Sequence, residues 1–293
     1  MKLKEILDKT TAFFKDKKIS TPRLDAELLI AHGLRLERIQ LYLKYDQPIT
    51  EGELVVLREL VRRRSQGEPV AYILGYRDFY KYRFAVNSSV LIPRPETEHI
   101  VEEVLAWAKN QEQSYALVDL GCGSGCIGLT LLKELPKAKL IAVDISENAL
   151  VVAKENANQL GVADRVHFMC MDADNFEIVI KECGDFLGQN KIDVVVANPP
   201  YIAIQDPQVE ENVKKYEPNL ALFANDQGMG LLKSWSKKYS EFLQHPGLML
   251  MEMGMSQGPT MKTHLEGLNK FNEIRIIKDL SGHDRVIRGE ING

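Results

Sequence analysis

The chain has 293 residues, of which 45% are hydrophobic and 27% are charged, and its formal net charge at pH 7 is −4. This length permits one large or two modest domains, and the composition is that of a soluble globular enzyme. No apolar run approaches a membrane span, the first residues lack the apolar core of a signal peptide, and the charge lacks the basic excess typical of a nucleic-acid enzyme.

Residues 1–75 are predicted to form a small helical domain. Apolar residues recur at helical spacing in three segments, which begin at Leu3, after Thr21-Pro22 and at Glu53. This part of the chain carries a small positive excess of charge, whereas the rest is acidic. The run Arg62-Arg63-Arg64 either meets an acidic partner or lies on a solvated helix face.

Residues 76–93 are predicted to form a β-hairpin, centred on Asn87-Ser88-Ser89, that links the helical domain to a catalytic domain at residues 94–293. Two interpretations of the segment from Pro93 to Glu96 stay open. It borders a cofactor and substrate channel, or it caps the first helix of the catalytic domain, which a proline in the first turn favours.

A glycine-rich loop follows the first strand of the catalytic domain. Residues 116–120 indicate a short buried strand, and residues 127–133 indicate a helix. Between them, Gly121, Gly123 and Gly125 lack the side chains that would keep a ligand away from the backbone. A strand, a glycine turn and a helix at the carboxyl edge of a sheet form a nucleotide-type crevice.

Two kinds of cofactor compete for this crevice. The glycine spacing formally fits the dinucleotide fingerprint, which is a weak signal by itself. Asp119, just before the first glycine, would repel a pyrophosphate and attract a cationic ligand. The second strand, residues 140–143, ends in Asp144, whose carboxylate suits the hydroxyls of a ribose. Asp144 fits both cofactors, and it could also serve as a helix N-cap.

The third and fourth strands also end in polar residues. Residues 166–171 lead to Asp172 and Ala173, which either lie near a ligand or form a solvated turn. Residues 194–197 lead to Asn198-Pro199-Pro200-Tyr201. The two prolines lack N–H groups and lock φ, so this corner is stiff and extended. Such a corner can hold a flat –NH2 group with fixed acceptors, although a proline-terminated strand with a capping Asn is the structural alternative.

The last part of the chain supplies three more strands, at residues 248–251, 273–277 and 285–288. Together with the four earlier strands they predict a seven-stranded, mostly parallel, doubly wound sheet whose last strand is antiparallel, with Gly247 as a turn residue before residue 248. His283 and Asp284 have no nucleophile to pair with, and we interpret them as polar groups of a turn.

The four cysteines show no metal-ligand pairing. They are Cys122, Cys126, Cys170 and Cys183. We therefore expect no metal, and reduced thiols in a cytoplasmic protein.

Three segments together resemble a known family. Residues 119–125, which read Asp-x-Gly-x-Gly-x-Gly, resemble motif I of class I S-adenosylmethionine-dependent methyltransferases, and residues 198–201 resemble the motif of those that modify planar amino groups. Residues 84–98, with Pro93-Arg94-Pro95-Glu96-Thr97-Glu98, are similar to the linker of the HemK/PrmC family. Its members methylate the N5 atom of the glutamine in the Gly-Gly-Gln motif of class 1 peptide chain release factors. The resemblance spans nearly the whole chain.

The resemblance implies a Rossmann-like α/β fold and S-adenosylmethionine as the methyl donor, with S-adenosylhomocysteine as the product. It implies a set of cofactor-binding residues: Asp119, Gly121, Cys122, Gly123, Ser124, Gly125, Asp144, Asp172, Ala173 and Asn198. Catalysis falls to Asn198, Pro199 and Tyr201, and substrate binding to these residues together with Pro200 and Arg94. Ala173 stands where some relatives have an aromatic residue, and Cys122 and Ser124 stand where threonine is common.

The resemblance also implies how the amide would be held. The Asn198 side-chain oxygen and the Pro199 carbonyl would each accept one N–H of the substrate amide, while Tyr201 would pack on its flat face or be an ordinary half-buried aromatic residue. The benefit would be mainly orientation of the nitrogen.

The expected partners are class 1 release factors, docked with help from the helical domain, and not stably bound nucleic acid or a membrane. We expect a monomer. The alternative function is methylation of an adenine amino group in nucleic acid, and weaker alternatives are a binding module without activity and a dehydrogenase.

Overall fold

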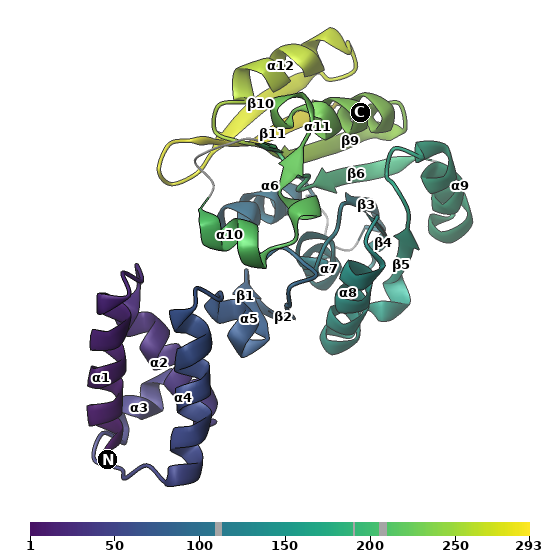
Figure 1. Ribbon diagram of the computed structural model, residues 1–293. Coiled ribbons are helices and arrows are strands. Elements are labelled where there is room, and N and C mark those ends of the chain that lie inside the picture. Colours follow the sequence, from purple (N-terminus) through teal and green to yellow (C-terminus); the bar gives the residue numbers. More distant parts are fainter. Residues whose placement is uncertain (109–112, 190, 205–209) are drawn as a thin grey trace. The chain divides into compact units, whose positions relative to one another are not determined.

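The structure of the protein is a computed structural model that describes residues 1–108, 113–189, 191–204 and 210–293 (Figure 1). These residues divide into two compact units. The first consists of residues 1–76 and 210–216, and the second of residues 77–209 and 217–293. A short segment distant in sequence therefore joins the N-terminal unit, which the sequence did not indicate. Among the described helices, none combines the length and the apolar character needed to cross a membrane.

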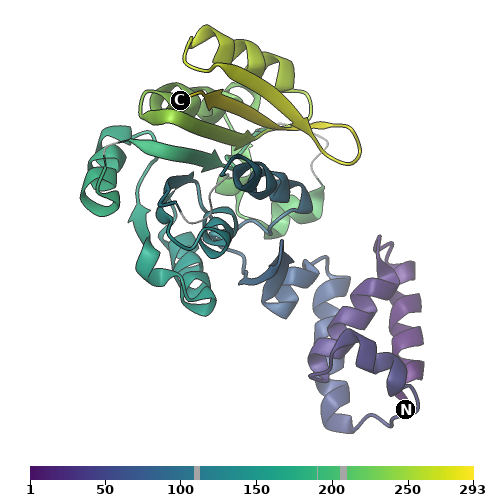
Figure 2. The same cartoon turned by 180° about the vertical axis from the view of Figure 1, so that it is seen from behind.

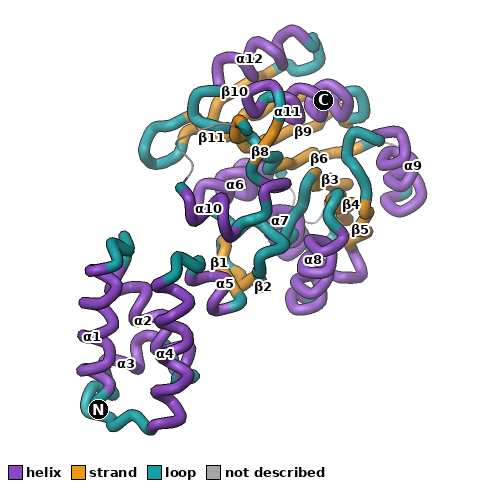
Figure 3. Tube along the Cα trace, viewed as in Figure 1, coloured by secondary structure: helices purple, strands orange, loops and turns teal. Residues whose placement is uncertain are grey.

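The regular elements of the first unit are helices joined by loops, apart from Tyr76, with which the first strand of the chain begins (Figure 3). Its helices are α1 (Leu3–Asp16), α2 (Pro22–Gly33), α3 (Arg38–Leu43), α4 (Glu51–Ser65), α5 (Val70–Leu74) and α10 (Glu211–Tyr216). Thr50 begins α4 with a capping box, since its hydroxyl accepts from the Glu53 amide while the Glu53 carboxylate accepts from the Thr50 amide. Leu7, Phe14 and Leu29 are fully buried in its core. The predicted helical domain is thus present with a core of its own.

The arginine run of α4 is paired within this unit. Arg62 binds Glu59, Arg63 binds Glu68, and Arg64 binds Asp25. The Asp25 side chain is 6% exposed, so the Arg64 pair is structural rather than a solvated charge. These contacts favour a structural role for the run over capture of an acidic partner.

The hairpin is shorter than predicted and is centred elsewhere. Strands β1 (Tyr76–Phe79) and β2 (Tyr82–Ala85) form a two-stranded sheet and turn at Tyr80, whose φ is +55°. The prediction that centred the hairpin on residues 87–89 is wrong. Those residues form a separate turn, because the Asn87 side chain accepts from the Ser89 amide and thereby offers a local alternative to strand pairing.

The second unit is built on the seven-stranded sheet that the sequence predicts (Figure 1). The strand order is β10-β11-β9-β6-β3-β4-β5. The bounds are β3 (Ala116–Leu120), β4 (Lys139–Asp144), β5 (Val166–Cys170), β6 (Ile192–Ala197), β9 (Leu243–Glu252), β10 (Glu273–Lys278) and β11 (Asp284–Ile291). β11 runs antiparallel to both of its neighbours, and the pairs among β9, β6, β3, β4 and β5 are parallel. The predicted antiparallel last strand is confirmed.

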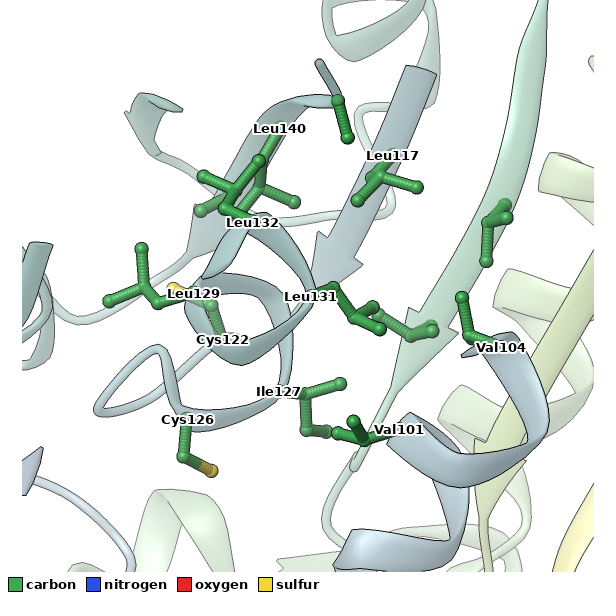
Figure 4. Close-up of a cluster of buried hydrophobic side chains, with 14 of the residues drawn as sticks. Val101, Val104, Leu117, Cys122, Cys126, Ile127, Leu129, Leu131, Leu132 and Leu140 are labelled. Carbon is green, nitrogen blue, oxygen red and sulfur yellow. The ribbon is translucent and has the colours of Figure 1, made fainter. Parts of the chain in front are cut away.

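Alternate residues of each strand enter different cores, so helices cover both faces of the sheet (Figures 1 and 2). Leu117 packs in the core beneath α6 (Glu98–Trp107), α7 (Cys126–Glu134) and α8 (Glu147–Leu160). Val118 packs in the other, beneath α9 (Phe176–Leu187), α11 (Gly230–Ser240) and α12 (Gly258–Gly267). Figure 4 shows the first core, in which side chains of α6, α7, β3 and β4 gather into one cluster. This is a three-layer, doubly wound α/β fold.

β9 begins earlier than residue 248, where the sequence placed its start. Gly247, expected to be a turn residue before this strand, lies within it and pairs with Ile291. The register between β6 and β9 shifts between Ile192 and Val194, so the early part of β9 is separated from the regular part by an irregularity. A five-residue apolar window could not show this extension.

Short elements complete the second unit. They are η1 (Pro95–Thr97), η2 (Ala163–Arg165), η3 (Asn219–Ala221), η4 (Asp226–Gly228), β7 (Ile202–Ala203) and β8 (Phe223–Ala224). β7 and β8 pair in parallel just beyond residues 198–201.

Candidate active site

A cavity of about 510 Å³ lies at the carboxyl edge of the sheet, within the second unit. The sheet register explains its position. Leu120 pairs with both Val143 and Ala197, and Ala197 pairs with Met251. The residues that follow each of these therefore form one row across four neighbouring strands: Gly121, Asp144, Asn198 and Glu252. A crevice outside the carboxyl ends of parallel strands is the usual ligand site of such a sheet.

The glycine loop adopts the conformation that its sequence predicts. Gly121, Gly123 and Gly125 all have positive φ, of 68°, 55° and 80°, which side chains with a Cβ rarely adopt. The amides of Gly121 and Cys122 donate to the Val143 carbonyl at 2.8 and 3.0 Å. The loop is therefore held against the end of β4. Gly121, Cys122, Gly123 and Ser124 all line the cavity.

Asp144 lines the cavity at the end of β4. One carboxylate oxygen accepts from the Gly123 amide and the other from the Ser146 amide, both at 2.8 Å. The N-cap of α8 is Ser146, whose hydroxyl accepts from the Ala149 amide, so the interpretation of Asp144 as the N-cap is wrong. Burial raises the pKa of Asp144, and its hydrogen bonds from backbone amides counter that rise.

Asp119 lies deeper than the sequence suggested and does not line the cavity. It is 1% exposed, and its Oδ2 accepts from the Gly128 amide at 3.0 Å. The other oxygen, Oδ1, is buried without a partner among the described residues. Burial raises the pKa of Asp119 to about 7, so the carboxyl group titrates near neutrality.

Asp172 and Ala173 both line the cavity, at the end of β5. Asp172 is exposed, and its side chain accepts from the Asp174 amide at 2.8 Å, so the residue lies in a turn as well as beside the cavity. Ala173 is buried, and its carbonyl accepts from the Tyr239 hydroxyl. The two interpretations offered for this segment are compatible.

The Asn198–Tyr201 corner contributes Asn198 and Pro200 to the cavity wall. Pro199 is buried, and neither it nor Tyr201 is part of the wall. The Asn198 amide nitrogen donates to Thr97 Oγ1 at 3.3 Å, and the Tyr201 hydroxyl donates to Glu252 Oε1 at 3.1 Å. Burial raises the pKa of Tyr201, so its phenol stays protonated.

Arg94 does not line the cavity. Its guanidinium binds Glu217 Oε1 at 2.6 Å, and Glu217 Oε2 accepts from the Ile92 amide. Glu217 is 5% exposed, so this pair ties the end of the linker to the segment after α10. Pro93 and Thr97 do line the cavity, and Pro95 begins η1, so the linker end both borders the cavity and starts a helical turn.

Sequence reasoning missed a buried asparagine that forms hydrogen bonds to the glycine loop. Asn156 of α8 is fully buried and bonds the backbone of two other segments. Its Oδ1 accepts from the Ala85 amide at 2.7 Å, and its Nδ2 donates to the Ala85 and Ser124 carbonyls. An asparagine on the apolar face of α8 was the available signal, since buried amides need partners.

Other wall residues were not among the predicted site residues. Ser88, Ser89 and Val90 belong to the turn after the hairpin, and Leu231 and Trp235 belong to α11. The Trp235 indole N–H is buried without a partner in the described part of the chain. The sequence indicated a turn at Ser88 and Ser89 but not their place beside the cavity, and nothing local marked Leu231 and Trp235.

The cysteines and His283 have no catalytic geometry. Cys122 and Cys126 line the cavity but are buried, which raises the pKa of both thiols, that of Cys126 to about 12. Among the described residues, no cluster of His, Cys, Asp or Glu could hold a metal ion. The His283 amide donates to Asp279, which agrees with a turn role for this residue.

Comparison with known proteins agrees with this geometry. The profile of the PrmC N-terminal domain matches residues 5–75, and that of a methyltransferase domain matches residues 111–265. A release factor glutamine methyltransferase of Rhodopirellula baltica is 37% identical over 96% of this chain and 94% of its own length. One of Chlorobaculum tepidum is 40% identical, with the same two coverages. The solved hMettl16 catalytic domain, in complex with a 3′UTR hairpin, is similar in fold alone, at a TM-score of 0.53 and 14% identity over 83% of each chain.

The doubly wound sheet, its glycine loop and the matching domain profile define a methyltransferase. The two relatives are each more than one-third identical to this chain over nearly its whole length, and this similarity decides the family. The chain belongs to the release factor glutamine methyltransferase family.

Proposed function

We propose that this methyltransferase transfers a methyl group from S-adenosylmethionine to the side-chain amide nitrogen of a release factor glutamine, the one in the Gly-Gly-Gln motif, and leaves S-adenosylhomocysteine. The observation that carries the proposal is that Asn198 lines the same cavity as the glycine loop. Family membership supplies the substrate class, since the relatives are named for this reaction.

The residues around the cavity suit such a cofactor. A volume of about 510 Å³ accommodates a nucleoside with an amino-acid tail. Asp144 is a candidate for the ribose hydroxyls, Gly121 and Gly123 give backbone access, and the segment at Asp172 and Ala173 is a candidate for the adenine. Asp119 behind the loop, with an unpartnered oxygen, favours a cationic ligand over a pyrophosphate.

The cofactor, when bound, supplies an electrophilic methyl group on a sulfonium. An amide nitrogen is a weak nucleophile because its lone pair is delocalised, so the chain's contribution is orientation. Asn198 Oδ1, at the cavity wall, is proposed to accept one N–H of the substrate amide. The Pro199 carbonyl is proposed to accept the other, although Pro199 is buried and is not part of the wall, and the two bonds together would fix the nitrogen in place. Accepting both protons also favours the charge that develops on the nitrogen.

The proposal needs no strong base among the neighbouring side chains. The nitrogen becomes more acidic once it carries the methyl group, so its proton can leave to water. Pro200 lines the cavity beside Asn198 and restricts the space around the amide. Tyr201 is proposed to support the corner from behind, since its hydroxyl is held by Glu252 rather than directed at the cavity.

Several proposals follow about the setting of this reaction. The helical unit, residues 1–76 with 210–216, is proposed to dock the release factor. The linker at residues 77–93 would then lead to the catalytic part, from residue 94 onward. We also propose that the active form is a monomer. Because release factors act in translation, we place the reaction in the cytoplasm.

The test is mass spectrometry of a release factor after incubation with the protein and S-adenosylmethionine. We expect a single added methyl group on the glutamine of the Gly-Gly-Gln segment. An RNA incubated in parallel with labelled cofactor serves as the competing substrate. Label in adenine of the RNA and none in the release factor would reject the proposal in favour of an adenine methyltransferase.

Asn198→Asp tests the role of the corner itself. The change replaces the carboxamide by a carboxylate of the same size, so we expect methylation to fall roughly 100-fold through loss of orientation. The measurement is kcat for the release factor, together with the Kd for S-adenosylhomocysteine. Full methylation at unchanged affinity would contradict the assignment.

A further inference from the structure

Three side chains from distant parts of the sequence form a continuous hydrogen-bonded series that begins at the cavity wall and ends behind it. The Asn198 Nδ2 donates to Thr97 Oγ1 at 3.3 Å, and the Thr97 hydroxyl donates to Glu252 Oε2 at 2.5 Å. Thr97 and Glu252 are each 1% exposed. The bond between Thr97 and Glu252 is therefore buried, although Thr97 and Asn198 also line the cavity, and hydrogen bonds to a buried carboxylate are strong.

The sheet register makes this arrangement a property of the fold. Ala197 of β6 pairs with Met251 of β9 in parallel, so Asn198 and Glu252 follow side by side at the carboxyl edge. Thr97, the last residue of η1, enters between them from the linker end. Thr97 had no predicted role of its own, and its hydroxyl connects the segment of residues 93–98 to Asn198.

Counting protons gives the series a direction. A threonine hydroxyl has one proton and can donate once. Because Thr97 donates to the Glu252 carboxylate, its oxygen can only accept from Asn198, which requires the –NH2 group of the amide on that side. No residue in the described ranges donates to Asn198 Oδ1, and Asn198 lines the cavity. The amide oxygen is thereby left available to a ligand.

We propose that Glu252, acting through Thr97, is a positioning residue that fixes the rotamer of the Asn198 amide so that its oxygen, and not its nitrogen, is presented to the substrate amide. This inference rests on the function proposed above. The two orientations of an asparagine amide differ little in shape, so packing alone does not select one of them. The wrong orientation would direct the –NH2 group of Asn198, a donor, at the –NH2 group of the substrate amide, which is also a donor.

Glu252 also holds the other polar residue of the corner. Its second oxygen, Oε1, accepts from the Tyr201 hydroxyl at 3.1 Å, so both oxygens of one carboxylate fix both ends of the Asn198–Tyr201 segment. The two prolines between them stiffen the backbone, whereas Glu252 fixes the side chains. Backbone and side-chain constraints therefore act on the same four residues.

The charge state of Glu252 follows from its surroundings. Burial raises its pKa, while hydrogen bonds from Thr97 and Tyr201 and the charge of Arg285 on β11 lower it, and Glu96 raises it. Cys126 of α7 also faces it, with a thiol that stays protonated. A protonated Glu252 could donate to Thr97, reverse the series and turn the Asn198 amide. We therefore expect kcat to fall as the pH is lowered through the raised pKa of Glu252.

Thr97→Val is the first test, since it removes the hydroxyl and keeps the shape. We expect kcat for release factor methylation to fall roughly 10- to 100-fold with KM nearly unchanged. Thr97→Ser keeps the hydroxyl and should restore most of the loss. Thr130→Val is the matched control, because Thr130 is also fully buried but its hydroxyl has no partner in the described structure. T130V should retain wild-type kcat.

Glu252→Gln is the second test and does not depend on the first variant being stable. A glutamine can accept from only one of its two partners and presents –NH2 to the other, so we expect a fall in kcat at least as large as for T97V. If the wild-type enzyme methylates the release factor and both T97V and E252Q retain its kcat, the inference is overturned. A loss equal in T97V, T97S and T130V would show general packing damage and would overturn it as well.

A spectroscopic readout separates this inference from the proposed function. The side-chain 15N–1H signals of Asn198, assigned by their loss in N198D, should shift in T97V and stay near wild type in T97S. This result is expected even if the wild type leaves the release factor unmethylated, an outcome that would reject the proposed function alone. Unchanged Asn198 signals in T97V would reject the positioning role.

Discussion

Asp119 and Asp144 lie near the carboxyl ends of the neighbouring strands β3 and β4 but have different hydrogen bonds. Asp144 accepts from two backbone amides, one for each oxygen. Asp119 accepts from one, the Gly128 amide, and leaves Oδ1 without a partner among the described residues. A buried carboxylate with half of its acceptor capacity unused is costly in its charged form, which is the physical cause of the raised pKa of Asp119.

We therefore expect Asp119 to make the free energy of unfolding depend on pH. The pKa is about 7 in the folded chain and near 3.8 unfolded, so between these values the folded state binds the extra proton and stability falls as the pH rises. Asp119→Asn removes this titration. Relative to D119N, the wild type should lose up to roughly 4 kcal/mol of unfolding free energy between pH 4 and 7.

The measurement is urea denaturation of both proteins, without cofactor, across this pH range. Above about pH 8 the difference between them should become constant, which serves as an internal control. A difference that is flat from pH 4 to 8 would show that Asp119 does not titrate there.

At the scale of elements, Asn156 joins three segments that are remote in sequence. It lies in α8 and bonds the end of β2 and the glycine loop. The linker strand and the loop are thereby fixed to one helix. Since Ser124 lines the cavity, the same contacts bear on ligand binding.

Asn156→Ala should therefore affect both stability and affinity. The change breaks one buried and two part-buried hydrogen bonds and leaves backbone groups unpaired, so we expect a loss of roughly 2–3 kcal/mol of unfolding free energy. The Kd for S-adenosylhomocysteine, measured by calorimetry, should rise because the loop is less constrained. Asn158→Ala, at an exposed position of the same helix, is the control and should change neither quantity. Equal behaviour of the two variants would contradict the role of Asn156.

Gly128 sets how closely α7 approaches the sheet. A Cβ at this position would lie 2.6 Å from a methyl group of Leu140 and 2.9 Å from Asp119 Oδ2. Both distances are too short, and the atoms belong to buried residues that cannot move away freely. The helix can lie this close to β3 and β4 only because residue 128 has no side chain.

Gly128→Ala should accordingly displace α7 and the glycine loop that leads into it. We expect a loss of roughly 1–3 kcal/mol in unfolding free energy and weaker binding of S-adenosylhomocysteine. Gly267→Ala is the control, because nothing lies within 4 Å of a Cβ there, at the end of α12 in the same unit. Thermal denaturation compares the two, and a stable G128A would show that the packing is looser than the distances indicate.

At the scale of the whole molecule, the chain enters the helical unit twice. Residues 1–76 form most of it, and residues 210–216 join it later, with the Tyr216 hydroxyl donating to the Gln66 carbonyl at 3.0 Å. The second unit has two cores of its own, one on each face of the sheet. Each unit can therefore bury apolar surface by itself.

Removal of residues 1–76 tests the division of labour between the units. We expect residues 77–293 to fold and to bind S-adenosylhomocysteine with a Kd within a few-fold of the full chain, because the cavity wall lies wholly in the second unit. Methylation of the release factor should be largely lost if the helical unit docks it. Circular dichroism and calorimetry establish folding and binding before activity is compared. Full activity of the shortened chain would contradict the proposal that the helical unit docks the release factor.

Much of this fold was open to prediction because its signals are local. Apolar runs marked all seven strands, and the glycine loop and the Asn198–Tyr201 corner marked two ends of the cavity. The hairpin was misplaced because the polar turn at residues 87–89 gives a strong turn signal, whereas the actual turn at Tyr80 and Lys81 has no glycine or proline. The turn composition therefore predicted a real turn at residues 87–89, but the two strands of the hairpin do not flank it.

Local patterns along the chain were enough to predict the fold class, the order of strands and helices, and the motifs at the ends of β3, β4, β5 and β6. The spacing of hydrophobic residues and the stiffness of the chain depend on neighbouring residues, so both can be predicted from the sequence without knowledge of the fold. The three-dimensional contacts were needed to show that Thr97 and Glu252 form a hydrogen-bonded series with Asn198, that Asn156 binds the glycine loop and that Arg94 pairs with Glu217. Those contacts join residues that lie between 32 and 155 positions apart. The parallel register of β6 and β9, which no local pattern encodes, brings Asn198 beside Glu252, and the packing of helices and loops on the sheet brings the other pairs together.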